Sequence, residues 1–191
     1  ITGTMSRAQA TRHRLQTTAF ELFTSKGFDN VTVEEIAAAA GVSHMTFYRN
    51  FPTKEAVVLD DPYDPLVFEA VAGQQPGIPA MEKVRRAVLE AFGRLDEPED
   101  RTMRQKIRLA ANHPGLRARV WENNLRTEGI IVDALVGGGT SRLEAAVAAG
   151  AVLGALTAAL FEWALDDSGG PLGERIGFAL DVLATPTVGA R

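Results

Sequence analysis

Apolar residues recur at helical spacing along most of the chain, and glycine or proline separates one such segment from the next. Residues 7–26 place four apolar side chains on one face of a helix, at i, i+4, i+7 and i+8. These are Leu15, Ala19, Leu22 and Phe23. Gly27 follows at the position that favours a C-terminal cap. The pattern therefore predicts a first helix that ends at Lys26.

The start of the next helix is specified by two pairs of side chains. Thr32 and Glu35 have the spacing of a capping box, in which each side chain bonds the other residue's backbone N–H. Val31 and Ile36 have the spacing of a hydrophobic staple across the same helix end. We expect a helix that begins after Thr32 and ends at Gly41.

The same arrangement recurs directly afterwards. Val42, Ser43 and Phe47 repeat the order of staple residue, cap and staple residue. They predict a helix of about seven residues, which Pro52 ends. Thr53 is placed to cap a further short helix.

The remainder of the chain also has the spacing of helices, with little pattern typical of strands. Further helical segments are expected up to about residue 72 and at about residues 80–95, 99–112, 116–136, 141–166 and 172–183. The sequence predicts an all-α protein with a small N-terminal domain, residues 7–60, and a larger helical domain, residues 61–185.

Two short helices joined by a turn at residues 40–42 have the form of a helix-turn-helix, whose second helix enters the major groove of DNA. Because residues of a helix are about 100° apart, Phe47 and Phe51 point together and must face a core. The residues at the tip and on the opposite side are His44, Met45, Thr46 and Arg49. This side is the one expected to reach the bases.

Three neighbouring residues favour contacts with phosphate. Ser43 and the free N–H groups at the start of its helix favour a phosphate oxygen, and the phenol of Tyr48 lies on the flank of the same helix. Lys54 lies in the first turn of a helix, where a cation opposes the helix dipole. A phosphate would explain this lysine, although an ordinary solvated side chain is the alternative.

The composition and charge are those of a globular protein with one basic end. The chain has 191 residues, 46% hydrophobic and 23% charged, with no cysteine, which excludes disulfides and thiolate metal sites. Its formal charge is −4, but residues 1–54 carry six basic and four acidic side chains, a net +2, and the remainder carries −6. This asymmetry is expected where one part meets a polyanion, although so small a net charge also arises by chance.

No arrangement typical of an enzyme occurs in the sequence. The three histidines, His13, His44 and His113, lack metal-ligand spacing, and there is no phosphate-binding glycine loop or G-x-S-x-G motif. His113 precedes Pro114 and is expected in a loop. The sequence predicts no catalytic residue, no metal and no cofactor.

The longest apolar stretch, residues 145–161, has no charged residue but is rich in alanine. It is at the short limit for a membrane-spanning helix, about 17 residues, and Glu144 and Glu162 flank it. A buried helix of a soluble protein is the better interpretation. Since no signal-peptide pattern precedes the first helix, we expect a cytoplasmic protein with no membrane partner.

The N-terminal motifs together resemble the DNA-binding domain of the TetR family of transcriptional regulators. The resemblance lies in residues 32–37, 41–43, 46–51 and 54–55, and in a first helix with residues 19–23 followed by 26–28. It covers about residues 10–60, while the rest of the chain matches only in its order of helices. The resemblance implies a homodimeric repressor that binds a palindromic operator in double-stranded DNA, often under the control of a small-molecule inducer.

By position, the resemblance assigns two sets of DNA contacts. Those to phosphate are Thr32, Ser43, Thr46, Tyr48 and Lys54. Those to bases are His44, Met45 and Arg49. Met45 offers only apolar contact, for example to a thymine methyl group.

The C-terminal domain is expected to dimerise and to hold a mostly apolar ligand. The many small residues of 141–166 let another helix approach closely, and with 172–183 they supply two helices per subunit to a four-helix interface. The alternative is that both helices are plain core. Candidate ligand-binding residues are Phe68, Phe92, Met103, Ile107, Trp121, Leu125 and Trp163. Any one of these is also a common type of core residue.

The sequence therefore predicts a dimeric, ligand-responsive repressor. Two alternatives stay open. One is a helical ligand-binding or protein-interaction module that no longer binds DNA, and the other is a DNA-binding activator.

Overall fold

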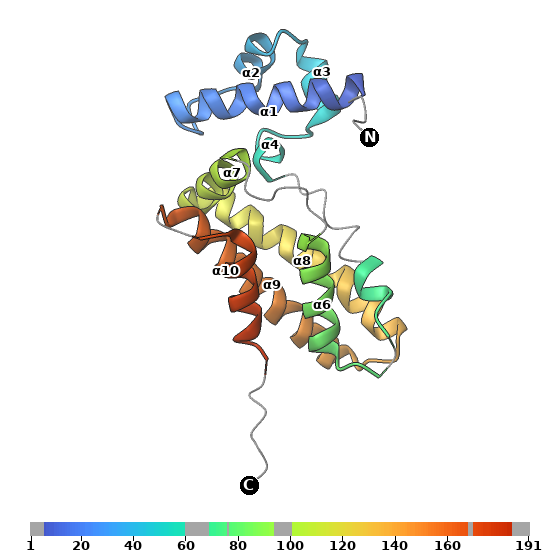
Figure 1. The fold of residues 1–191 in the computed structure, drawn as a ribbon. Coiled ribbons are helices and arrows are strands. Elements are labelled where there is room, and N and C mark those ends of the chain that lie inside the picture. Colours follow the sequence, from blue (N-terminus) through green and yellow to red (C-terminus); the bar gives the residue numbers. More distant parts are fainter. Residues whose placement is uncertain (1–5, 60–68, 76, 94–100, 168–169, 185–191) are drawn as a thin grey trace. The chain divides into compact units, whose positions relative to one another are not determined.

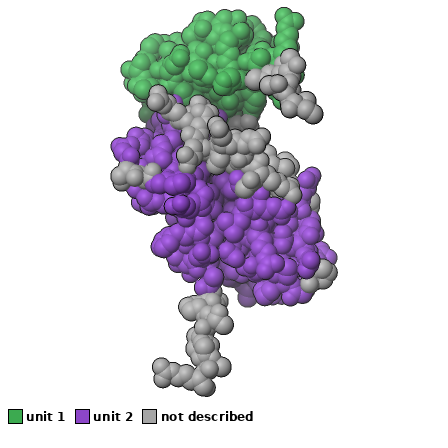
Figure 2. Space-filling view, in the orientation of Figure 1, with its two compact units in different colours: residues 1–60 green, residues 61–191 purple. Residues whose placement is uncertain are grey.

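The computed structural model describes residues 6–59, 69–75, 77–93, 101–167 and 170–184. No β-strand occurs among these residues (Figure 1), which confirms the predicted all-α fold. Contacts within the chain divide it into two compact units, unit 1 (residues 1–60) and unit 2 (residues 61–191), which Figure 2 shows in different colours.

The helices of unit 1 begin and end where local side chains satisfy the backbone. They are α1 (Arg7–Lys26), α2 (Val33–Ala39), α3 (His44–Asn50) and α4 (Ala56–Leu59). Gly27 ends α1 with a φ of 82°, and its N–H bonds the Phe23 carbonyl. Thr32 and Glu35 form the predicted capping box of α2. Thr53 Oγ1 accepts the N–H of Ala56 at 3.1 Å, as expected for the cap of α4.

Aromatic rings form much of the core of unit 1. The ring of Phe23 lies 5.9 Å from that of Phe20 and 4.9 Å from that of Phe28, between centroids. Ile36 of α2 and Phe47 of α3 are fully buried, and α2 contacts both α1 and α3. The buried side of α2 therefore packs against α1, and α3 is held in the core through its contact with α2.

Unit 2 is built around one long helix. Its helices are α6 (Ala80–Gly93), α7 (Arg101–Asn112), α8 (Pro114–Gly137), α9 (Arg142–Leu165) and α10 (Leu172–Asp181), and residues 69–72 are also helical. The central helix, α9, contacts α6, α7, α8 and α10 (Figure 1).

α9 is long and apolar enough to cross a membrane by length and composition alone, with a mean hydropathy of 1.8 over its most apolar window. In unit 2 one side of α9 is instead packed against the other helices. Residues along its whole length are buried, from Ala145 through Val152 to Trp163. Its apolar character therefore matches its place in the core.

The start of α8 differs from the expectation. The helix begins at Pro114 rather than near Leu116, and His113 is its N-cap, with Nδ1 accepting the Leu116 N–H at 3.1 Å. Proline suits the first position of a helix because its fixed φ is helical and its missing N–H is not needed there. His113, which was expected in a loop, thus caps a helix. Histidine is not among the residue types usually expected at an N-cap, which are Ser, Thr, Asp and Asn.

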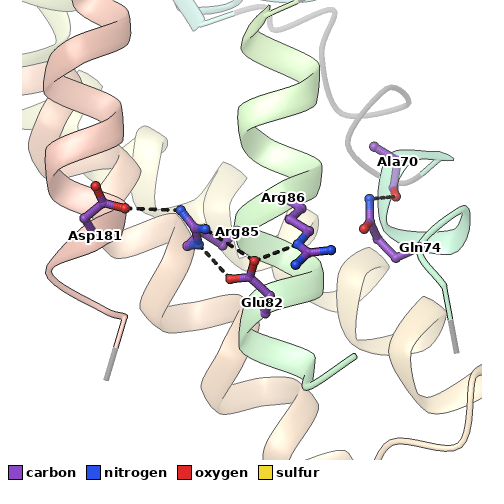
Figure 3. A network of polar contacts seen from close by, with 6 residues as sticks. All are labelled: Ala70, Gln74, Glu82, Arg85, Arg86 and Asp181. Atoms are coloured by element: carbon purple, nitrogen blue, oxygen red, sulfur yellow. Dashed lines mark hydrogen bonds and ion pairs between the residues drawn. The ribbon is translucent and has the colours of Figure 1, made fainter. Parts of the chain in front are cut away.

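A polar network joins α6 to α10 at the surface of unit 2 (Figure 3). Glu82 of α6 accepts hydrogen bonds from Arg85 Nε at 2.7 Å and Arg86 Nε at 2.6 Å. Arg85 Nη1 also lies 3.2 Å from Asp181 Oδ1 of α10. The hydrogen bonds from Arg85 and then Arg86 lower the pKa of Glu82 from 4.5 to about 2.

We expect Glu82→Gln to lower the stability of the protein at neutral pH but not in acid. Because the pKa of Glu82 is lowered on folding, its contribution is complete above about pH 4.5 and lost as the pH falls toward about 2. The free energy of unfolding in urea should differ from wild type by about 1 kcal/mol at pH 7, and less at pH 3. Exposed Glu69 provides the control, Glu69→Gln. An equal difference at both pH values would contradict this role of the Glu82 charge.

Candidate nucleic-acid interface

One side of α3 is fixed in the core of unit 1. Its N-cap, Ser43, accepts the Thr46 N–H at 3.1 Å, as predicted. Phe47 and Phe51 are both 0% exposed, and their ring centroids lie 5.9 Å apart. The opposite side of α3 therefore faces solvent.

An arginine of α1 fixes the C-terminal end of α3. Arg12 Nη1 donates a hydrogen bond to the Asn50 carbonyl, and its guanidinium lies 4.1 Å from the centroid of the Phe51 ring. A cation at a helix C-terminus also complements the helix dipole. Sequence reasoning missed Arg12, although its spacing from Leu15 and Ala19 places it on the buried side of α1. A charged residue on such a side needs a partner.

The outward side of α3 carries most of the predicted DNA contacts. Its exposed residues are His44, Met45, Tyr48 and Arg49, and Thr46 is half-buried. Met45 is 67% exposed although it is apolar. The same helix thus presents one apolar and several polar side chains to solvent, as a DNA-contacting helix requires.

Hydroxyl groups connect Ser43, Thr46 and Arg49. Thr46 Oγ1 lies 2.9 Å from Ser43 Oγ and accepts a hydrogen bond from Arg49 Nη2 at 3.1 Å. The guanidinium has five N–H donors, and guanine offers two acceptors, O6 and N7, in the major groove. Thr46 therefore orients an arginine that is equipped to bind guanine.

His44 lies between α3 and the first turn of α2. Its Nε2 is 3.2 Å from Glu34 Oε1, and its ring packs edge-on against Tyr48, with 4.6 Å between centroids. The contact with Glu34 is an ion pair only when the histidine is protonated. These contacts restrict the ring at the tip of α3.

Thr32 lies at the exposed start of α2. Its hydroxyl accepts the Glu35 N–H at 3.1 Å, and Glu35 Oε2 accepts the Thr32 N–H at 2.9 Å. Lys26 Nζ donates to Glu35 Oε1 at 2.9 Å. The bond from Lys26, followed by that from the Thr32 backbone, lowers the pKa of Glu35 below its usual value. The Thr32 hydroxyl retains its own hydrogen as a donor to phosphate.

Lys54 has a role inside unit 1 that its place in the sequence did not indicate. Its Nζ donates to the Phe28 carbonyl at 2.9 Å and to the Val31 carbonyl at 3.0 Å, and it lies 4.3 Å from the centroid of the Phe28 ring. An ammonium has three donors. Two of these donors bond carbonyls of the loop before α2 and so connect this loop to the segment at the start of α4. The third donor is available for a hydrogen bond to a phosphate oxygen.

The residues predicted to bind a ligand do not share one site among the described residues. Phe68 lies outside the described residues. Trp121 and Leu125 are exposed and line a groove between α8 and α9. Phe92, Met103 and Ile107 are half-buried and pack against the core of unit 2, in which Trp163 is buried.

Trp163 carries a buried donor without an acceptor. The residue is 1% exposed, and its indole N–H has no hydrogen-bond partner among the described residues. The Arg104 guanidinium covers the ring at 4.1 Å from its centroid. Leaving such a donor unpaired costs about 1–3 kcal/mol, which a bound acceptor would remove.

The chain matches two family models. Residues 16–60 match the bacterial regulatory proteins of the tetR family, and residues 78–187 match the MftR C-terminal domain. The first match contains the helix-turn-helix of unit 1, and the second contains the described helices α6 to α10 of unit 2.

A relative of similar length has a regulatory name. A candidate mycofactocin biosynthesis transcriptional regulator of Mycobacterium tuberculosis, MftR, is 30% identical over 183 residues, which are 93% of this chain and 91% of that protein. This relative extends the similarity beyond the helix-turn-helix to nearly the whole chain.

Solved structures share the fold over nearly the full length. The TetR-family repressor FadR of Thermus thermophilus, solved with lauroyl-CoA, is 26% identical with a TM-score of 0.53, over 94% of this chain and 96% of that chain. The SmeT–triclosan complex is 20% identical with a TM-score of 0.62, over 91% and 90%, and shows the fold alone. Given both family models and the relative, the chain belongs to the TetR family of bacterial transcriptional regulators and is a DNA-binding regulator rather than an enzyme.

Proposed function

We propose that the protein is a cytoplasmic, homodimeric repressor that binds a palindromic operator and is released by a mostly apolar small molecule. The observation that carries the DNA-binding part is the outward side of α3. It presents His44, Met45 and Arg49 to solvent while Phe47 anchors the other side.

Each unit has its own task in this proposal. Residues 7–60 bind DNA, and residues 61–185 dimerise and hold the ligand. In each half of the operator, α3 lies in the major groove. The predicted phosphate contacts set its position, and His44, Met45 and Arg49 contact the bases.

The charge distribution makes binding depend on few contacts. Residues 1–54 carry a net +2 and the remainder −6, so the larger part of the chain repels phosphate. We therefore expect binding to be sensitive to salt and to need both halves of the dimer.

Fluorescence anisotropy with DNA from the protein's own promoter region tests the proposal. A palindromic fragment should bind at low salt, and a scrambled fragment of equal length should bind more weakly. If no palindromic fragment binds at low salt, the repressor proposal fails in favour of a module that no longer binds DNA. A reporter gene behind the operator separates repression from activation.

We expect Arg49→Ala to change the sequence preference of the protein. Because Thr46 orients the guanidinium at the outward side of α3, its loss should cost about 1–3 kcal/mol at one base pair in each half-site. Affinities for a set of operators, in which each position carries each of the four bases in turn, measure this loss of preference. Glu21→Ala, at an exposed position of α1, is the control. Equal losses for operator and scrambled DNA would contradict a base contact by Arg49.

The ligand part of the proposal is supported by Trp163. Its buried, unpaired N–H calls for an acceptor, and the half-buried Phe92, Met103 and Ile107 offer apolar surface to a ligand in unit 2. FadR of Thermus thermophilus was solved with lauroyl-CoA, which is therefore a suitable probe. It should quench tryptophan fluorescence and release the operator. A ligand that binds without releasing DNA would contradict the proposed control.

A further inference from the structure

The large exposed apolar side chains of unit 2 lie on three helices and at the end of one of them, among the described residues. They are Trp121, Leu125 and Val136 of α8, Leu143, Val147 and Leu165 of α9, and Phe178 of α10 with Val182 at its C-cap. On α9, Leu143, Val147 and Leu165 share a side with Gly154, because 4, 7 and 11 residues are close to whole turns. Concentrated apolar exposure of this kind marks a surface that a partner covers.

A groove lies between α8 and α9 on this surface. It has a volume of about 250 Å³. Its lining residues are Trp121, Asn124, Leu125 and Glu128 of α8, with Gly150, Leu153 and Gly154 of α9. Since a cavity of about 150 Å³ accommodates benzene, the groove is large enough for an aromatic ring.

The glycines of the groove have no explanation within the chain. A Cβ at Gly154 would meet no atom within 4 Å, and one at Gly150 would make only ordinary contact with the Glu128 carboxylate at 3.7 Å. A glycine inside a helix is destabilising by about 1 kcal/mol relative to alanine. The space above Gly154 is therefore open to a group from outside the chain.

The chain itself offers a side chain of the right kind. Phe178 of α10 is 73% exposed, so it does not occupy the groove of its own subunit. In a two-fold dimer the same surface of both subunits forms the interface. A side chain that protrudes from one subunit then faces a hollow of the other, and this contact occurs twice. We propose that the groove between α8 and α9 receives Phe178 of the partner subunit. This inference rests on the dimer that the proposed function includes.

Charge also favours this arrangement. Glu128 is the charged residue that lines the groove, is half-buried, and has no ion pair or hydrogen bond among the described residues. Arg175 lies one turn before Phe178 on α10. One of its five donors is used by Asp166 Oδ2 at 2.6 Å. A second copy that places its phenyl ring in the groove therefore brings a cation toward an unpaired carboxylate.

Two substitutions test the fit from opposite sides. Phe178→Ala removes the ring, and Gly154→Leu fills the groove without meeting other atoms near its Cβ. Sedimentation velocity over a dilution series of the full-length protein gives the dimer dissociation constant. Because each change acts twice in a symmetric dimer, we expect increases of at least about 100-fold for Phe178→Ala and about 30-fold for Gly154→Leu. Gln105→Leu, at an exposed position of α7 outside the groove, is the control and should leave the constant unchanged.

The double variant identifies where the ring binds. If Phe178 of the partner subunit occupies the groove, the two effects are not multiplied in Phe178→Ala/Gly154→Leu, because the leucine enters space that the ring has left. Circular dichroism of each variant verifies the fold.

Each other outcome overturns the inference in a distinguishable way. If each single variant dimerises as tightly as wild type, the ring does not bind in the groove although the dimer exists. The same conclusion follows if the two effects on the dissociation constant multiply in the double variant. Loss of binding of the apolar probe 1-anilinonaphthalene-8-sulfonate in Gly154→Leu, with an unchanged dimer, assigns the groove to a small molecule. A wild-type protein that stays monomeric at micromolar concentration overturns the proposed dimer itself.

Discussion

Phe47→Ala should abolish operator binding by unfolding unit 1 while unit 2 stays folded. Phe47 is 0% exposed and contacts Tyr48 and Phe51, with 5.6 and 5.9 Å between ring centroids. Truncating a buried phenylalanine costs about 3–5 kcal/mol. Native proteins have a free energy of unfolding of about 0.05–0.15 kcal/mol per residue. The total stability of a unit of this size is therefore little larger than the loss expected from the substitution.

Limited trypsin digestion and anisotropy measure the two effects separately. Cleavage within residues 7–60 should become fast in the Phe47→Ala variant, and cleavage within the helices of unit 2 should stay slow. Met45→Ala is the matched control for stability, because Met45 is on the same helix but 67% exposed. If Phe47→Ala keeps unit 1 resistant to trypsin, the buried side of α3 is not what holds it in place.

Lys54→Met should lower both the stability of unit 1 and its affinity for every DNA sequence. The substitution keeps the apolar stem but leaves the Phe28 and Val31 carbonyls without their charged donor. Hydrogen bonds to charged groups contribute about 1.5–3 kcal/mol, so we expect a loss of roughly 3 kcal/mol for the pair. Lys26→Met is the matched control, because Lys26 pairs with Glu35 at the surface and should change stability by less than about 1 kcal/mol.

Salt dependence separates the two roles of Lys54. If its third donor contacts a phosphate, the slope of log affinity against log salt concentration falls by about 1 in Lys54→Met, and does not fall in Lys26→Met. A normal stability would contradict the contacts with the two carbonyls. A normal slope would contradict the phosphate contact.

Local signals were sufficient for the boundaries of the helices in unit 1. The capping box of Thr32 and Glu35 and the cap at Ser43 join residues three positions apart. Such signals are contained within one turn of helix, so they are visible in the sequence and do not depend on what packs around them. The buried side of α3 follows in the same way from the spacing of Phe47 and Phe51.

The candidate ligand site could be predicted only in part. Large apolar residues identify a core or a pocket without separating the two, and the structure separates them into exposed, half-buried and buried groups. Trp121 and Leu125 line the groove between α8 and α9, whereas Trp163 is in the core with its N–H unpaired. Whether a buried donor has an acceptor depends on every element packed around it.

The sequence by itself determined the all-α class, the helix-turn-helix and the side of α3 that faces outward, because these follow from spacings of a few residues. Only the tertiary structure decided the partners of Lys54 and Arg12. Lys54 bonds carbonyls 26 and 23 residues away, and Arg12 bonds one 38 residues away. The groove that faces Gly154 was likewise decided by how α8 packs on α9. Contacts between residues so distant depend on how the helices pack, and no periodicity along the chain encodes them.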